Sequence, residues 1–461
     1  MTASDPDRPI PAAGAGPRVR PWRADLPLYA LWAAGAVLAA ALFLELALRI
    51  DPERKVIHGV DGVGYTLWVR SLVGDGDLDF ADEIDRVHPG ELPGADQRTA
   101  TGLRPNKYGV GVSLLASPFY AVARVVDRAR GAVGAEAEEG WTVVDRAALA
   151  LASIAWGFTG LVLAHRLALR VAGPAAAGWA VSLLAAGTNV LYYFVREPFL
   201  SHLDSFFALA LATWLTERAW RRGGGVDAWL AAGAAAGLAA TVRLTGILFL
   251  AVPLVVLGTD AKREGRWRRD RLAGLAVGWA LGMAPQLLAW RIVYGAWWAD
   301  AYEGEGFTHL FAPKLLAVLV SSRHGLLAWS PLLVLALAGV PELLRRTPVW
   351  GRALLVWAAL LWWANASWEQ WWLGHSFGHR GFICLFPFFA VALAVFLDGP
   401  ARRLDRRLVV GAIALGVAWN AALMLAYLAE MIPYSGSFSW WAFVTSLPDL
   451  PAAVWRKAHG G

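Results

Sequence analysis

Long apolar runs recur along the chain and are separated by short links that are rich in arginine or aromatic residues. A run of about 17 to 25 apolar residues is long enough to cross the hydrocarbon core of a membrane as a helix. The run AALALASIAWGFTGLVLA is apolar all round, whereas a barrel strand would alternate apolar and polar residues over about ten positions. Because only helices and closed barrels satisfy every backbone group in lipid, the pattern predicts an all-α polytopic membrane protein.

We predict about eleven transmembrane helices within a domain of residues 26–430. The first run, Leu26–Ile50, is too long for a signal-peptide core and lacks a clear cleavage site, so we interpret it as an uncleaved anchor. A disordered cytoplasmic tail is expected at residues 1–25, and a short external tail at 431–461. The predicted spans after the first are 145–167, 174–195, 199–219, 227–242, 244–258, 272–293, 325–343, 351–367, 381–398 and 408–429.

The longest polar stretch, residues 51–145, contains one further apolar run, Tyr108–Val126. If that run crossed the membrane, the five arginine-rich clusters HRLALR, ERAWRR, KREGRWRRDR, LLRRTPVWGR and ARRLDRR would all lie outside. Basic residues favour the cytoplasmic side, so we predict that Tyr108–Val126 dips into or lies along the outer leaflet. Residues 51–145 then form one large external loop with amphipathic juxtamembrane helices, the N-terminus lies inside and the C-terminus outside.

Composition agrees with a membrane protein, since 57% of the residues are hydrophobic and 17% are charged, against about 25% charged in soluble domains. The net charge is +6, and the basic residues lie in short clusters that flank the apolar runs. This arrangement indicates membrane topology rather than binding of nucleic acid. Cys384 is the single cysteine, so the chain has neither an internal disulfide nor a cysteine metal cluster.

The external loop begins with a predicted interfacial helix, VGYTLWVRSLV, in which Tyr65 and other apolar residues recur at spacings of three and four. Asp61 stands at its start. A carboxylate there caps exposed amides and suits the helix dipole, or acts as a general base at the membrane surface. The sequence leaves both interpretations open.

The segment DGDLDFADE has acids at alternate positions, as a calcium loop begins. Phe80 occupies the place where an EF-hand needs glycine, and Arg86 the place of its bidentate glutamate. The sequence therefore excludes an EF-hand. Asp75, Asp77 and Asp79 are expected to be turn and cap residues, with a divalent metal ion as the alternative.

Several cations stand at the predicted external ends of spans. Lys107 precedes a glycine-rich helix start, where it either binds phosphate or snorkels to the interface. Arg243 lies at a turn between two short spans, and an intramembrane charge is a functional candidate; we favour a phosphate partner over a carboxylate. Further candidates for binding substrate are Tyr65, Tyr108, Arg196, His202, Arg323, Trp371, His375 and Arg380. His375 and His379 are four residues apart, but Gly378 between them argues against a helical metal pair.

The order of these segments resembles that of bacterial GT-C membrane glycosyltransferases. It is similar to the layout of protein O-mannosyltransferases and of the aminoarabinose transferase of lipid A, from about residue 28 to 430. The segments that carry the resemblance are DGVGYTLWVRSLVGDGDLDF, NKYGVGVSLLASPFY, SHLDSFF, TVRLTG, RHGLLAWSPLL and WWLGHSFGHRGF.

The resemblance implies an inverting transfer of a sugar from a polyprenyl-phosphate donor to a lipid, glycan or protein acceptor, on the external side of a bacterial plasma membrane. Asp61 would deprotonate the acceptor, and Lys107, Arg243 and Arg380 would bind the phosphate. These relatives commonly have Asp-Glu in the first loop, whereas Gly62 follows Asp61 here, so a second acid would come from Asp82, Glu83 or another loop.

Two other classes of function remain open on the sequence alone. A transporter usually places polar groups near mid-membrane, often in repeated halves, and we find neither pattern. A lipid flippase or an assembly subunit without catalytic activity would keep the bundle and would not need Asp61.

Overall fold

The computed structural model of the chain describes residues 22–47, 57, 59–88, 90–92, 94, 96–302 and 304–459. Every regular element in these ranges is a helix, so the predicted all-α class is confirmed. Most of the predicted tail at residues 1–25 lies outside them, and Trp22–Asp25 form a short 3₁₀ helix, η1. The end of the first predicted span, beyond residue 47, also lies outside them.

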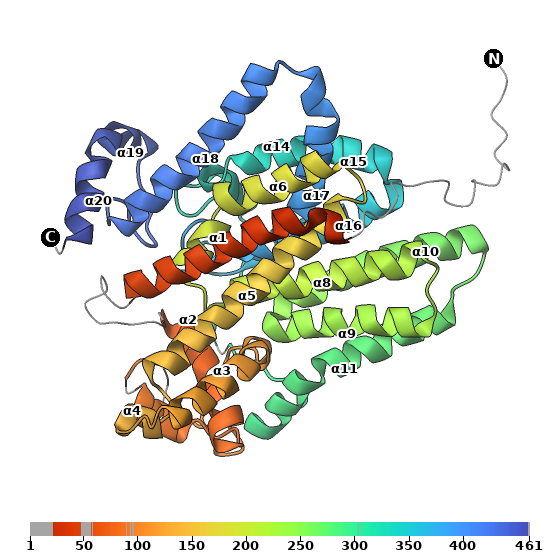
Figure 1. Ribbon diagram of the computed structural model, residues 1–461. Coiled ribbons are helices and arrows are strands. Elements are labelled where there is room, and N and C mark those ends of the chain that lie inside the picture. The colour runs from red at the N-terminus through yellow and green to blue at the C-terminus, as the bar shows by residue number, and fades with distance from the viewer. Residues whose placement is uncertain are drawn as a thin grey trace, which may run out of the picture.

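The helices follow one another as drawn in Figure 1. In chain order they are α1 (Leu26–Glu45), α2 (Gly59–Arg70), α3 (Gly111–Ala129), α4 (Ala135–Glu138), α5 (Val143–Ala168), α6 (Pro174–Gly187), α7 (Val190–Val195), α8 (Ser201–Arg221), α9 (Val226–Val242), α10 (Ala251–Glu264), α11 (Arg269–Val293), α12 (Ala317–Val320), α13 (Leu326–Trp329), α14 (Leu332–Ala338), α15 (Val340–Arg346), α16 (Pro348–Ser367), α17 (Phe386–Asp398), α18 (Arg406–Leu428), α19 (Trp440–Ser446) and α20 (Leu450–Ala458). The short elements are η3 (Ser71–Asp75) and η4 (Glu83–Val87), which are π-helical, and η5 (Leu244–Leu250), η6 (Arg380–Leu385), η7 (Pro400–Arg403) and η8 (Leu447–Asp449), which are 3₁₀ helices.

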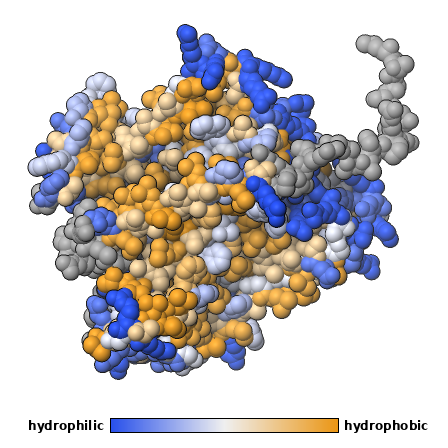
Figure 2. All heavy atoms as spheres, viewed as in Figure 1, coloured by the Kyte–Doolittle hydropathy of each residue, from blue (hydrophilic) through white to orange (hydrophobic). Residues whose placement is uncertain are grey.

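Within the described residues, six helical stretches are long and apolar enough to cross a membrane. They are Trp22–Glu45, Val143–Ala168, Leu244–Glu264, Arg269–Val293, Arg380–Arg403 and Arg406–Leu428. Figure 2 shows apolar residues over the middle of the molecule and polar residues gathered toward its ends. The chain is therefore a multi-pass membrane protein, whereas the number of eleven spans stays a prediction.

Two predicted spans are broken rather than continuous. The span at 174–195 is interrupted at Thr188, between α6 and α7, and the span at 325–343 is divided among α13, α14 and α15. The predicted external tail at 431–461 contains α19 and α20, which lie beside the end of α18 (Figure 1).

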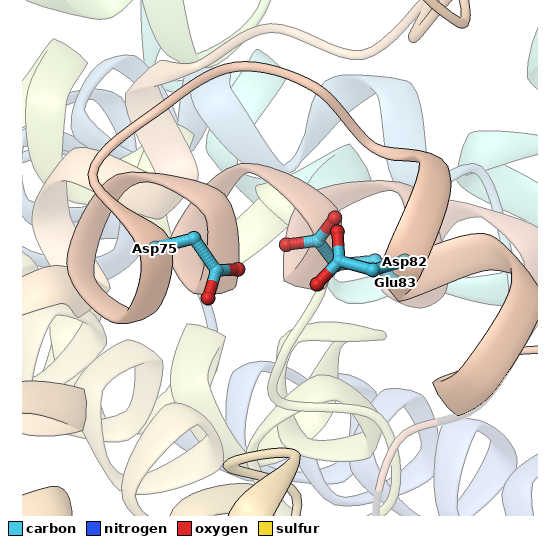
Figure 3. A group of neighbouring side chains, drawn as sticks. All are labelled: Asp75, Asp82 and Glu83. Carbon is cyan, nitrogen blue, oxygen red and sulfur yellow. The ribbon is translucent and has the colours of Figure 1, made fainter.

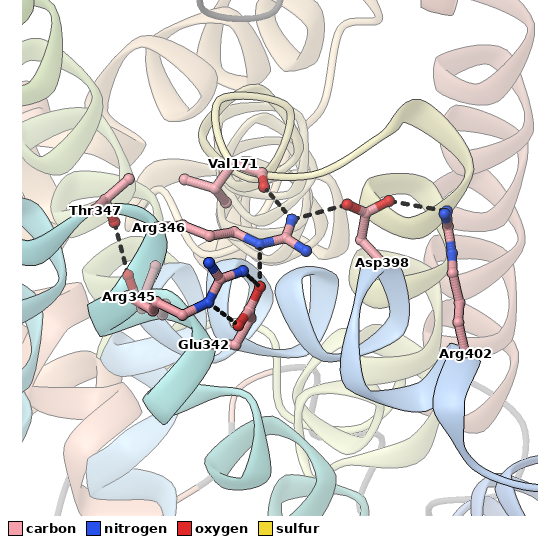
Figure 4. Close-up of polar contacts among 8 residues, drawn as sticks. Val171, Glu342, Arg345, Arg346, Thr347, Asp398 and Arg402 are labelled. Atoms are coloured by element: carbon pink, nitrogen blue, oxygen red, sulfur yellow. Dashed lines mark hydrogen bonds and ion pairs between the residues drawn. The ribbon is translucent and has the colours of Figure 1, made fainter. Parts of the chain in front are cut away.

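The five arginine-rich clusters meet at one end of the bundle. Arg170 pairs with Glu217 at 3.5 Å, and Arg271 donates a hydrogen bond to the carbonyl of Gly223. Figure 4 shows the remaining connection, in which Arg346 donates to the carbonyl of Val171 at 2.9 Å and to Asp398 at 2.8 Å, while Glu342 and Arg402 extend the network. The shared end agrees with the topology that we predicted; the side of the membrane that it faces stays a prediction.

Helices α9 and α11 lie side by side (Figure 1) and approach each other through small residues. A methyl group added at Gly278 would collide with the carbonyl oxygen of Leu230, and one at Gly282 with that of Ala234. Gly233 and Gly237 face α11 in the same way. Small residues at such spacing let membrane helices pack backbone to backbone, and this packing positions the ends of both helices.

We expect Gly278→Ala to destabilise the protein by about 1–3 kcal/mol, the usual cost of overpacking, because neither backbone can give way. The measurement is the thermal unfolding midpoint of the purified protein in detergent. The matched control is Gly411→Ala on α18, where the added methyl would meet no described atom within 4 Å. Equal midpoints for the two variants would contradict close packing of α9 on α11.

Candidate active site

A cavity of about 1580 Å³ opens at the end of the bundle opposite the arginine-rich clusters. Its walls come from the starts of α2 and α8, the loop before α3, and the last turns of α9, α11, α16 and α18. Nine of the predicted site residues line it: Asp61, Tyr65, Lys107, Tyr108, Arg196, His202, Arg243, His375 and Arg380. Residues far apart in the sequence therefore meet in one chamber.

Asp61 lies in the first turn of α2 and contacts two other segments. Its Oδ1 accepts a hydrogen bond of 2.8 Å from the Tyr108 hydroxyl, and its Oδ2 lies 3.1 Å from Nη1 of Arg380. The carboxylate is thus held by partners on both oxygens, while about a third of the side chain, 34%, remains exposed.

The glycines around Asp61 and Tyr108 explain why these segments meet. A methyl group at Gly64 would collide with the ring of Tyr108, and methyl groups at Gly109 and Gly111 would collide with the backbone of α9 near Thr241. The motif NKYGVG therefore packs against α2 on one side and against the end of α9 on the other. The helix predicted at VGYTLWVRSLV forms, but it is buried from residue 62 to 70 rather than lying with one face in the interface.

Burial raises the pKa of the Asp61 carboxyl, but the charge of Arg380 and the hydrogen bond from Tyr108 outweigh it, so the net pKa lies below its ordinary value of 3.8. Burial and the neighbouring Asp61 raise the pKa of the Tyr108 hydroxyl well above its ordinary value. At neutral pH the site therefore contains an ionised carboxylate that accepts a hydrogen bond from a neutral phenol.

Arg243 is held by a histidine rather than by an acid. Its Nη1 lies 2.9 Å from Nδ1 of His202, and because a guanidinium can only donate, this nitrogen accepts and the proton of the neutral ring sits on Nε2. Among the residues that the structure describes, no carboxylate lies within 4.0 Å of Arg243. Lys107 differs, since its Nζ pairs with Glu305 at 2.6 Å.

A second carboxylate, Glu197, also lines the cavity. It accepts a hydrogen bond of 3.0 Å from the Tyr192 hydroxyl, and burial raises the pKa of its carboxyl. Our sequence analysis expected the second acid at Asp82, Glu83 or another loop. Neither Asp82 nor Glu83 lines the cavity, whereas Glu197, on another loop, does. The signal for Glu197 was its place between an arginine and a proline just before α8, at the same end as Asp61.

Two predicted substrate-binding residues, Arg323 and Trp371, are not among the cavity-lining residues. Arg323 stacks on the ring of Trp372 and donates its Nε–H to the carbonyl of Ser435, while Trp371 packs edge-on against Trp372. His375 and His379 also lie in different environments. His375 is exposed at the cavity, whereas His379 is buried and its pKa falls to about 3 because burial disfavours its charge.

One wall of the cavity is apolar and reaches the molecular surface. It is formed by Leu244, Ile247 and Leu248 of η5 together with Leu360 and Trp363 of the adjacent α16. Three of these side chains, Leu244, Leu360 and Trp363, are 37–40% exposed although they also line the cavity. The chamber therefore joins a charged interior to an apolar opening on the side of the bundle.

We expect Tyr108→Phe to destabilise the protein at neutral pH, because the variant loses a hydrogen bond to an ionised carboxylate. A lowered carboxyl pKa contributes stability that is present above the ordinary value of 3.8 and is lost as the pH falls through the lowered pKa. The difference in unfolding midpoint should therefore shrink below about pH 4. Tyr302→Phe is the control, since no hydrogen bond joins its hydroxyl to another described residue. A difference that does not change with pH would contradict the assigned contact.

Comparison with known proteins gives matches in structure only: no family model and no curated protein sequence matches the chain. ArnT from Cupriavidus metallidurans in its apo state matches with a TM-score of 0.53 and 14% identity, over 93% of this chain and 74% of that one. The same protein bound to undecaprenyl phosphate gives 0.48 and 17%, over 93% and 74%. The oligosaccharyltransferase AglB from Archaeoglobus fulgidus, with an inhibitory peptide and a dolichol-phosphate, gives 0.44 and 14%, over 95% of this chain and 56% of that one. The match to apo ArnT shows the fold: the chain is a polytopic membrane protein with a GT-C-like fold, as its sequence predicted.

Proposed function

We propose that this protein is an inverting glycosyltransferase that moves a sugar from a polyprenyl-phosphate donor to a hydroxyl or amine of an acceptor. The observation that carries the proposal is the composition of one cavity. An ionised carboxylate, Asp61, lines it together with Arg243, which has no carboxylate partner among the described residues. Apolar side chains that reach the molecular surface complete the lining. The GT-C-like fold supports the same class of reaction.

The donor fits the cavity in two parts. A phosphate needs cationic donors in a water-poor site, and Arg243 and Lys107 supply them, with Arg243 the stronger candidate because Lys107 is already neutralised by Glu305. A prenyl chain needs an apolar groove, which the surface between η5 and α16 supplies. The lipid would then enter from the membrane while its phosphate meets the cations.

The reaction needs one displacement at the anomeric carbon. The acceptor oxygen or nitrogen forms a bond to this carbon, the bond from the carbon to the phosphate oxygen breaks, and its electron pair leaves on the polyprenyl phosphate. Asp61 receives the acceptor proton. Its low pKa keeps it deprotonated beforehand, and the proton moves as the new bond makes the acceptor strongly acidic. Arg243 stabilises the charge that develops on the departing phosphate.

Arg380 and Tyr108 hold Asp61 in place, so we assign them to positioning the base as well as to the edge of the phosphate site. Glu197 supplies the second acid of the chamber. With a raised pKa and a tyrosine partner, it suits hydrogen bonding to a sugar or acceptor hydroxyl better than a permanent ion pair.

The location follows from the charge distribution. Basic clusters favour the cytoplasmic side, and the cavity lies at the opposite end of the bundle. We therefore place the N-terminus in the cytoplasm and the active site on the external face of a bacterial plasma membrane.

We expect Asp61→Asn to lower transfer at least about a hundredfold, because asparagine keeps the shape of the side chain but cannot take the proton. The measurement is transfer of radiolabelled sugar from a panel of polyprenyl-phosphate donors in membranes that contain each protein. Asp227→Asn, an exposed acid on α9 at the basic end, is the control. Wild-type activity in Asp61→Asn would show that another residue is the base. If the wild type transfers sugar from none of the donors, a transporter or an assembly subunit would be favoured instead.

We expect Arg243→Gln to weaken binding of undecaprenyl phosphate about tenfold or more, since it removes a charge-assisted contact to the phosphate. Binding is followed by tryptophan fluorescence of the purified protein. Arg352→Gln serves as the control, because Arg352 is exposed near the start of α16 at the basic end. Among the described residues, it donates a hydrogen bond only to the carbonyl of Pro348 in its own helix. Equal affinities of the two variants would show that Arg243 does not contact the phosphate.

A further inference from the structure

Three acids of the large loop face one another outside the cavity. Asp75 ends η3, Asp82 precedes η4 and Glu83 begins it. Figure 3 shows Asp75 pointing toward the adjacent carboxylates of Asp82 and Glu83. One oxygen from each lies within 4.8 Å of the others. We call these three residues the acidic cluster.

Glu83 is the member that most needs a partner. Its side chain is fully buried, and neither of its carboxylate oxygens has a hydrogen-bond partner in the described structure. The nearest cation, Nη1 of Arg70, lies 3.8 Å from Oε1, which is longer than a hydrogen bond. Burying a carboxylate without hydrogen bonds costs free energy. The geometry therefore favours a cation or a proton between the three acids.

The acidic cluster and the residues joined to it by ion pairs carry two more negative than positive charges. Arg70 also lies 3.7 Å from Glu139, and Arg86 lies 3.5 Å from the same acid. With all groups ionised, the acidic cluster and Glu139 carry four negative charges, and the two arginines carry two positive charges. One divalent cation would balance this difference.

The other acids of the segment have partners of their own. Asp77 accepts hydrogen bonds from the Ser71 hydroxyl and from the amide of residue 79, and Asp79 accepts one from the amide of residue 81. The predicted turn and cap roles of these two residues are thus confirmed, and neither belongs to the acidic cluster. Asp75 differs, because it turns toward Asp82 and Glu83.

We propose that the acidic cluster binds one hard divalent cation, with calcium as the ion that fits best. Carboxylate oxygens are ligands for hard cations such as Ca²⁺, Mg²⁺ and Mn²⁺. Two oxygens on opposite sides of a calcium ion are about 4.8 Å apart, since each Ca–O distance is about 2.4 Å, and the oxygens of the cluster lie within this span. Water and backbone carbonyls would complete the coordination.

The bound ion would fasten η3 to η4. Because η3 directly continues α2, the ion would fix the far end of the helix whose first turn carries Asp61. It would be a structural site, remote from the reacting atoms, and it is independent of the proposed glycosyl transfer.

A proton is the competing occupant. Burial, together with the negative charge of Asp82, raises the pKa of Glu83 to about 9. A protonated Glu83 could therefore share its hydrogen with Asp82 and neutralise part of the cluster without a metal.

The experiment uses the full-length protein in detergent, freed of metal by EGTA and EDTA. We expect added CaCl₂ to raise the thermal unfolding midpoint saturably, with MgCl₂ and MnCl₂ tested in parallel. Asp75→Asn should raise the half-maximal calcium concentration about tenfold or more, since calcium affinity follows the number of charged ligands. Asp75 is exposed, so the variant should still fold. Asp79→Asn, an exposed neighbour that does not belong to the acidic cluster, should respond as the wild type does.

Glu83→Gln separates the metal from the proton. If calcium binds, this variant also loses the calcium response and is less stable than the wild type in calcium. The proposal is overturned if none of the three cations changes the midpoint of the wild type, or if Asp75→Asn and Glu83→Gln respond to calcium as the wild type does. A Glu83→Gln variant as stable as the wild type, with no response of either to a cation, would assign the site to the proton.

Discussion

The contact of Asp61 with Arg380 and Tyr108 is the constraint on which the arrangement of the cavity depends. A carboxylate removed from water needs a cation and hydrogen bonds close to it, and here these come from segments far apart in the chain. The ion pair and the hydrogen bond to Asp61 hold the start of α2, the loop before α3 and the start of η6 together. Arg243 and Glu197 then line the same chamber because α8 begins there and α9 ends there.

The bundle separates its charges between two ends. At one end, acids such as Glu217, Glu342 and Asp398 bind arginines of the five basic clusters, so that these cations are neutralised by structural contacts (Figure 4). At the other end, Arg243 has no carboxylate partner among the described residues and faces an open cavity. Arginine therefore makes structural ion pairs at one end, whereas at the other end Arg243 is free of such a pair among the described residues, as the proposed phosphate contact requires.

Six acids of the large loop fall into three structural groups. Asp61 faces the cavity, Asp77 and Asp79 hold the turn after η3, and the acidic cluster lies between the two π-helical turns. Their concentration in one segment thus reflects several different structural roles. The hydrophobic contact of Trp68 with Phe80 packs the inside of this loop.

The sequence by itself determined the membrane class, the helical content and most positions of the helices. The length and apolarity of a run are local properties, and they decide whether the run can cross the hydrocarbon core as a helix. The sequence also pointed to Asp61, Arg243 and Arg380, since charges at the ends of apolar runs are costly without a function. Only the tertiary structure decided which polar groups share a cavity. It brought in Glu197, left out Arg323 and Trp371, and set Glu83 beside Asp75, because such pairings depend on how distant helices pack and no local pattern encodes that packing.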